Sequence, residues 1–220
     1  MLVAEAVAAG WDVQAQFVAP GGQPVSGAGV VHRVAAGVIE KVATTESPQP
    51  VMAIVSRRPS SIDALQRATF VVVADRISDP GNLGTILRSA EASGAGAVVL
   101  TPGTVDPTNP KVVRASAGSI FHVPIVDDLP LAELADHSLV RLGTSSHLGR
   151  DVTTTDLTRR VAIVLGNEAH GLADDAPVDE WVTIPHVGRS ESLNVAMAAA
   201  VLCFEVARQR RAASDTFSQS

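Results

Sequence analysis

The sequence predicts an α/β protein in which a domain built on a parallel sheet follows a smaller α/β module. Two runs, Phe70–Ala74 and Val161–Leu165, are apolar at every position, which is typical of strands buried on both faces of a parallel sheet. A helical apolar pattern and another strand, Ala97–Leu100, follow the first run and predict a βαβ unit. A chain of 220 residues is long enough for one or two domains.

Residues 1–56 are predicted to form the smaller module. We expect a helix over residues 2–9, a strand over 12–19, a loop over 21–29, a helix over 34–42 and a strand over 51–56. Because a helix at the first residues has no earlier strand to pack on, we expect that an N-terminal strand is missing. Residues 57–68 mix proline, serine and both charges, and are predicted to be a linker.

Strands and helices alternate over residues 69–211, the predicted larger domain. Pro80 and Gly81 signal a turn, and Asn82 is expected to cap a helix that ends near residue 93 and places Arg88 off its apolar stripe. We expect further helices over residues 110–117 and 131–136, and strands over residues 138–142 and 181–184. Residues 212–220 are small and polar and are predicted to be a disordered tail.

Residues 184–205 lead from the last strand through a polar turn into a helix. This helix is apolar on nearly every side from residue 195 to residue 204, so it is expected to be buried on every side, in its own domain or against a second subunit. Ser190, Ser192 and Asn194 stand at its start, where such side chains accept hydrogen bonds from unpaired N–H groups. A capped core helix would explain these residues without any function.

The composition excludes several classes of protein. With 17 basic and 23 acidic side chains the net charge is −6, which argues against nonspecific binding to nucleic acid or membrane unless basic groups cluster locally. Aromatic residues make up 3%, too few for a surface that stacks single-stranded bases. The single cysteine, Cys203, lies in the apolar helix, and we find no signal peptide or membrane-spanning run, so a cytoplasmic protein is expected.

Several chemistries lack their sequence patterns. The six histidines have no metal-ligand spacing, so no metal is expected, and there is no Walker motif or serine nucleophile elbow. Three polar loops remain, each directly after a strand: residues 75–88, 166–172 and 186–194. Ligands of parallel sheets bind beyond the carboxyl ends of the strands, so the three loops are expected to share one site. One arginine, one carboxylate and several amides and hydroxyls suit a polyanionic substrate with a small cofactor, and an ordinary small-molecule binder stays open.

The three loops carry patterns that resemble the three motifs of the SpoU family of RNA ribose methyltransferases, in the SPOUT superfamily. The patterns are D-x-x-x-x-P-x-N-x-x-x-x-x-R from Asp75 to Arg88, L-G-N-E-x-x-G-L over residues 165–172, and I-P-x-x-G-x-x-x-S-L-N from Ile184 to Asn194. Residues 111–124 also resemble a segment of the family. Asn167 and His170 occupy variable positions of the second motif. Residues 38–55 resemble the end of the L30-like RNA-binding domain that precedes the catalytic domain in many members.

The resemblance implies a SPOUT-type sheet with a C-terminal trefoil knot, and a homodimer whose active site spans both chains. It implies S-adenosyl-L-methionine as cofactor and 2′-O-ribose methylation of RNA as the activity. Ribosomal RNA, 23S in particular, is favoured over transfer RNA because an L30-like leader is commoner with ribosomal targets. A nonenzymatic RNA-binding or ribosome-assembly factor that retains the knot is the alternative.

The resemblance also implies roles for individual residues. Arg88 would either activate the ribose hydroxyl or clamp a neighbouring phosphate. Gly166 would let the backbone approach the cofactor closely, so Gly166→Val would abolish binding and leave the fold largely intact. The implied catalytic residues are Arg88, Asn82, Glu168, Ser192 and Asn194, and the implied cofactor contacts are Thr144, Gly166, Ile184 and Leu193. The basic side chains expected to contact RNA are Arg33, Arg57, Arg58, Lys111 and Arg114.

Overall fold

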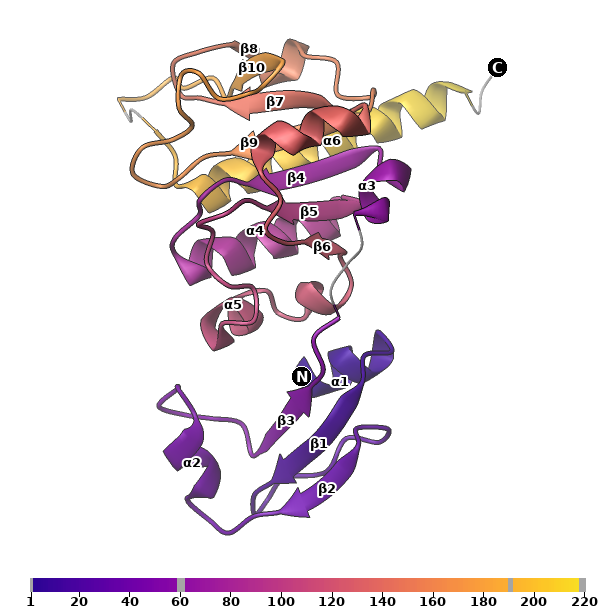
Figure 1. Ribbon diagram of the computed structural model, residues 1–220, viewed down its shortest axis with the longest axis vertical. Coiled ribbons are helices and arrows are strands. Elements are labelled where there is room, and N and C mark those ends of the chain that lie inside the picture. The colour runs from indigo at the N-terminus through magenta and orange to yellow at the C-terminus, as the bar shows by residue number, and fades with distance from the viewer. Residues whose placement is uncertain (1, 59–61, 190–191, 218–220) are drawn as a thin grey trace. The chain divides into compact units, whose positions relative to one another are not determined.

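The computed structural model describes residues 2–58, 62–189 and 192–217. The chain divides into two compact units, Met1–Arg58 and Pro59–Ser220 (Figure 1). Within its described residues the first unit has three strands in the order β2-β1-β3, with β1 parallel to β2 and antiparallel to β3. Its elements are α1 (Leu2–Ala8), β1 (Val13–Val18), β2 (Val30–Arg33), α2 (Val38–Val42) and β3 (Val51–Val55).

The prediction for residues 21–42 is wrong in two respects. Strand β2 lies where the sequence pattern predicts no strand, and α2 begins at Val38 rather than at residue 34. The Val34 N–H donates to the Val18 carbonyl (3.0 Å), which prolongs the pairing of β1 with β2 and keeps Val34 out of a helix. All four residues of β2 are exposed, so no buried alternation marks this strand in the sequence.

The second unit is built on a parallel sheet, which confirms the predicted fold class. Among the described residues its strand order is β6-β5-β4-β9-β7-β10-β8, and every neighbouring pair is parallel (Figure 1). The strands are β4 (Phe70–Ala74), β5 (Ala97–Leu100), β6 (Ile125–Val126), β7 (Val140–Thr144), β8 (Arg150–Asp151), β9 (Val161–Leu165) and β10 (Glu180–Thr183). The central strands β4 and β9 are the two apolar runs of the sequence, and all their residues are buried.

Helices cover both faces of this sheet. Phe70 and Val72 of β4 share one core with α4 and α6, whereas Val71 and Val73 share another with α3 and η2. This alternation explains why every position of the strand is apolar, since each residue faces one of the two cores. The helical elements are α3 (Asp63–Arg67), α4 (Pro80–Ala92), α5 (Pro110–Ala115), η1 (Ser119–Phe121), η2 (Leu131–His137), η3 (Val152–Thr154) and α6 (Val195–Phe217).

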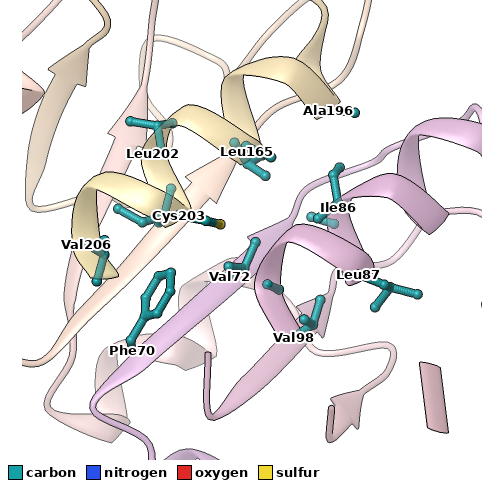
Figure 2. Close-up of a cluster of buried hydrophobic side chains, with 14 of the residues drawn as sticks. Phe70, Val72, Ile86, Leu87, Val98, Leu165, Ala196, Leu202, Cys203 and Val206 are labelled. Atoms are coloured by element: carbon teal, nitrogen blue, oxygen red, sulfur yellow. The ribbon is translucent and has the colours of Figure 1, made fainter. Parts of the chain in front are cut away.

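The long helix α6 packs across β4, β9 and α4. Leu202, Cys203 and Val206 lie against Phe70 and the strands beneath them (Figure 2). Cys203 is therefore a core residue, as predicted, and burial raises the pKa of its thiol to about 12. No helix of the described ranges combines the length and hydropathy needed to cross a membrane.

Three boundary predictions are wrong. The predicted linker, residues 57–68, contains helix α3. The carbonyls of Leu65 and Gln66 in its last turn, and of Ala68 just beyond it, accept hydrogen bonds from the Arg160 guanidinium. The predicted disordered tail continues α6 as far as Phe217. The strand predicted over residues 138–142 begins only at Val140, because Ser138 takes a left-handed conformation at the end of η2. The sequence pattern also does not predict β6 and β8, which are two residues long.

Candidate active site

The three motif loops leave the same edge of the sheet. Loops 75–79 and 166–172 follow the neighbouring strands β4 and β9, and the loop from Ile184 follows β10. Strand β7 lies between β9 and β10, and the Ser145 N–H just beyond it donates to the Val182 carbonyl (3.1 Å). Because parallel strands present their carboxyl ends together, the sheet brings the motifs to one place, as the sequence predicts.

Helix α4 begins at this edge, and its cap differs from the prediction. The side chain of Asp79 accepts a hydrogen bond from the Asn82 N–H (2.9 Å), so Asp79 is the cap and Asn82 lies inside the first turn. Pro80 follows at the first helical position, where its fixed φ is favourable. The backbone hydrogen bond from Asn82, and then the Lys111 ammonium, lower the pKa of Asp79.

Glu168 joins the second motif loop to the first. Its carboxylate accepts hydrogen bonds from the Ser78 N–H (3.1 Å) and hydroxyl (2.9 Å), the Asp79 N–H (2.9 Å) and the Asn82 side-chain amide (3.1 Å). Loss of solvation would raise the pKa of Glu168, but the hydrogen bonds from Asn82, Asp79 and Ser78 outweigh it and lower the pKa to about 2. Glu168 is therefore ionised at neutral pH and too weak a base to take a proton from a hydroxyl.

Asn194 joins the third motif to the other two. Its side-chain nitrogen donates to the Asn82 side-chain oxygen (3.1 Å), and its own oxygen accepts from the Ala196 (2.9 Å) and Met197 (3.3 Å) N–H groups. The predicted capping role at the start of α6 is thus confirmed. Asn82 stands at the centre of the cluster, with its amide nitrogen on Glu168 and its oxygen on Asn194.

Other predicted catalytic residues lie outside this cluster. Arg88 is exposed on α4, and its guanidinium makes no hydrogen bond or ion pair with another described residue. Ser192 is exposed beside Asn194. Ser190, the other serine of the turn, lies outside the described residues.

The predicted cofactor residues surround the ends of β7, β9 and β10. The Thr144 hydroxyl donates to the Val164 carbonyl (2.9 Å), so its side chain is already engaged. Ile184 is half-buried against the core, and Leu193 is exposed. A Cβ on Gly166 would lie 2.3 Å from backbone atoms of Gly171 and Leu172. The loop's own backbone therefore leaves no room for a side chain here, which argues against the expectation that Gly166→Val leaves the fold largely intact.

The predicted RNA contacts are all exposed, on two separate units. Arg58 donates to the Gly10 carbonyl (2.6 Å) within the first unit. On α5, Lys111 pairs with the capping carboxylate of Asp79 (3.3 Å). No group of three histidine, cysteine or acidic side chains that could hold a metal ion occurs in the part of the chain that the structure describes. The remaining basic residues of the prediction are Arg33 and Arg57 in the first unit and Arg114 on α5.

Sequence patterns did not single out two residues that the site uses. Asp79 caps α4, and an aspartate directly before proline could have indicated this. The side-chain amide of Asn167 donates to the Arg76 carbonyl (2.8 Å), and its oxygen accepts from the Ala169 N–H (3.0 Å). The Asn167 and Arg76 positions are 91 residues apart in the chain, so only the fold reveals this contact.

Known proteins resemble this chain in both sequence and fold. Residues 69–204 match the sequence profile of the SpoU rRNA methylase family. A 23S rRNA (guanosine(2553)-2′-O)-methyltransferase of Bacillus subtilis is 38% identical over 75% of this chain and 67% of its own length. A 23S rRNA (uridine(2479)-2′-O)-methyltransferase of Streptomyces viridochromogenes is 35% identical over 75% of this chain and 62% of its own length. The chain thus spans about two thirds of these relatives.

A solved structure extends the likeness to nearly the whole chain. The SpoU methyltransferase AviRb of Streptomyces viridochromogenes, in complex with the cofactor AdoMet, superposes with a TM-score of 0.83 at 30% identity. The match covers 96% of this chain and 88% of that one. The likeness therefore includes the first unit as well as the domain that carries the motifs.

Proposed function

This chain belongs to the SpoU rRNA methylase family, and on that premise we propose that it methylates a ribose 2′-hydroxyl of 23S ribosomal RNA. The observation that supports the proposal most directly is the cluster of Asn82, Glu168 and Asn194, which joins one residue from each motif loop by hydrogen bonds. Each of these residues belongs to one of the three motifs that resemble those of the family. The named relatives, both 23S rRNA 2′-O-methyltransferases, favour ribosomal over transfer RNA as the substrate.

The edge formed by β9, β7 and β10 fits S-adenosylmethionine. Apolar side chains of Leu148 and Leu193 are exposed there, 46% and 38%, and can cover an adenine ring, while backbone at Thr144 and Ile184 can meet its polar edges. When bound, the cofactor supplies an electrophilic methyl group on a positively charged sulfur. No metal is needed for such a transfer.

The chain's residues then have to orient the ribose and accommodate the charge of its oxygen. The Glu168 carboxylate already accepts hydrogen bonds from Ser78, Asp79 and Asn82, so we assign it to holding the first motif in place rather than to accepting the proton. The exposed guanidinium fork of Arg88 can clamp the RNA phosphate and stabilise the developing alkoxide. Ser192 and Asn194, at the start of α6, would orient the ribose.

We further propose a homodimer through α6. Met197, Val201 and Phe204 follow one another at helical spacing and are 64%, 46% and 49% exposed, although the opposite side of the helix is buried. A second copy that presents the same stripe would cover these side chains by two-fold symmetry. The trefoil knot of the family is part of the same proposal, and the return of α6 from β10, next to the edge strand β8, to the central β9 supports it.

The first unit and the basic side chains would contribute RNA affinity. We propose that the unit is the L30-like module of the family and contacts RNA through exposed Arg33, Arg57 and Arg58, with Lys111 and Arg114 of α5 acting on the second unit. The reaction would take place in the cytoplasm, which suits a chain with one buried cysteine.

Methyl transfer to purified ribosomal RNA tests this function. We expect the wild type to transfer labelled methyl groups from S-adenosylmethionine to 23S RNA at one ribose, located by mapping the 2′-O-methyl group. Arg88→Ala should bind S-adenosylhomocysteine normally and lose transfer, whereas Arg67→Ala, an exposed helical arginine at the amino end of β4, should keep it. Transfer at the wild-type rate by Arg88→Ala would remove Arg88 from the mechanism, and labelling of transfer RNA alone would exclude the ribosomal substrate.

A further inference from the structure

We propose that Asn167 is a positioning residue for methyl transfer, acting through the hydrogen bond from its side-chain amide to the Arg76 carbonyl. The proposal rests on the function proposed above and adds a role for a residue outside the implied catalytic and cofactor-binding sets. The two atoms lie 2.8 Å apart and join residues that are 91 positions apart in the chain. This contact therefore ties the second motif loop to the backbone of the first.

The backbone of Arg76 has an unfavourable conformation, which the surrounding contacts must stabilise. Its φ is 54°, in the left-handed region that long side chains rarely adopt. Its N–H donates to the Thr101 hydroxyl (3.1 Å), and its guanidinium pairs with the buried carboxylate of Asp75 (3.0 Å). These contacts hold the amide and the side chain, and the Asn167 amide holds the carbonyl. Residues in such conformations often mark functional loops.

The direction of the Arg76 carbonyl controls the residues that follow it. Ser78 and Asp79 point their N–H groups at Glu168, at 3.1 and 2.9 Å, only if the loop keeps its present course. Asp79 then caps α4, the helix that carries the catalytic arginine. Asn167 therefore acts on the reacting groups through the loop and the start of α4, without touching the substrate.

The Asn167 side chain also accepts hydrogen bonds within its own loop, and the test has to distinguish these from the bond to the Arg76 carbonyl. Its oxygen accepts from the Ala169 (3.0 Å) and His170 (3.3 Å) N–H groups and forms a turn inside its own loop. Asn167→Asp keeps this acceptor, since aspartate forms such turns well. It replaces the donor with an oxygen that faces the Arg76 carbonyl, near the Glu168 carboxylate, which lies 3.4 Å from the native amide nitrogen.

Protonation of the new carboxylate would restore a donor toward Arg76. The neighbouring Glu168 carboxylate favours the protonated form of the new side chain in Asn167→Asp. The guanidinium of Arg76 and the ring of His170, when charged, favour its ionised form; the His170 Nδ1 lies 3.2 Å from the native Asn167 oxygen. Asn167→Ala offers no such recovery, because it lacks both contacts at every pH. The two variants therefore form a matched pair.

The test compares kcat, KM and amide hydrogen exchange for the wild type and both variants. At about pH 8, misplacement of the loop should lower kcat of both at least about tenfold, and Asn167→Asp should bind S-adenosylhomocysteine within about twofold of the wild type. Divided by the wild-type value at the same pH, kcat of Asn167→Asp should rise as the pH falls, and that of Asn167→Ala should not. Exchange at Ser78 and Asp79 should be faster in both variants.

Several results would overturn the proposal. Wild-type kcat in Asn167→Asp at high pH would show that the Arg76 contact is not used. A fall in kcat together with cofactor affinity, with unchanged exchange at Ser78 and Asp79, would show that Asn167 acts only inside its own loop. If the wild type transfers no methyl group, the proposed function fails separately, and unchanged exchange in the variants would then overturn the tie to the first motif loop as well.

Discussion

Replacement of Gly166 by alanine should move the loop that carries Glu168. The added Cβ would stand 2.3 Å from the Gly171 carbonyl carbon and from the Leu172 nitrogen, whereas ordinary contacts begin at 3.4 Å. The backbone at residue 166 must therefore move away from the backbone of Gly171 and Leu172 by about 3.4 − 2.3 = 1.1 Å. A comparable displacement of Glu168 would stretch its hydrogen bonds to the first motif loop, now 2.9 to 3.1 Å, out of range.

The expected size of the effect follows from this overlap. Overpacking against a backbone that cannot move aside usually lowers the free energy of unfolding by about 2 kcal/mol. In a unit of this size that change corresponds to a fall of about 4–8 °C in melting temperature. Misplacement of the catalytic loop by about 1 Å should lower kcat about a hundredfold. Thermal unfolding, calorimetry with S-adenosylhomocysteine and the methyl-transfer assay measure the three quantities.

Two other glycines serve as controls for backbone strain. Gly94 and Gly171 have φ of +84° and +66°, and a Cβ on either meets nothing within 4 Å. Alanine at either position should therefore lower stability by about 1–2 kcal/mol through the left-handed backbone alone. Gly94→Ala, beyond the carboxyl end of α4, should also leave kcat unchanged. Wild-type melting temperature and activity in Gly166→Ala would refute the reasoning about this loop.

Three further predictions concern the interface, pH and RNA binding. Val201→Glu should dissociate or unfold the protein, because an unpaired charge is costly in a buried interface, and a monomeric wild type in light scattering at micromolar concentration would contradict the dimer. The pKa of Glu168 is depressed in the folded chain, so its contribution to stability is present above about pH 4.5 and is lost as pH falls toward about 2. The difference in unfolding free energy between wild type and Glu168→Gln should therefore shrink over that range, and a constant difference would argue against it. Lys111→Ala and Arg114→Ala should each reduce the salt dependence of RNA affinity by about 0.7 in log–log slope, and an unchanged slope would remove that side chain from the interface.

Part of the site could be predicted from the sequence because parallel strands impose their geometry. Any polar loop that follows a buried strand of such a sheet must emerge at the carboxyl edge, so the meeting of Asn82, Glu168 and Asn194 follows from three strand assignments. The cap of α4 could not be assigned in the same way. Asp79 and Asn82 are both good capping residues. The proline after Asp79 favours Asp79, and the hydrogen bond from the Asn82 N–H to the Asp79 carboxylate decides between them.

The sequence by itself determined the parallel sheet, its two central strands and the membership of the family, because burial on both faces and three spaced motifs leave direct marks in the residues. Only the tertiary structure decided which partners the motif residues take. Glu168 is held by Ser78, Asp79 and Asn82, about 90 positions earlier in the chain, and Gly166 is needed because its own loop folds back upon it. Such contacts depend on atomic distances between loops, and no local pattern of residue types records those distances.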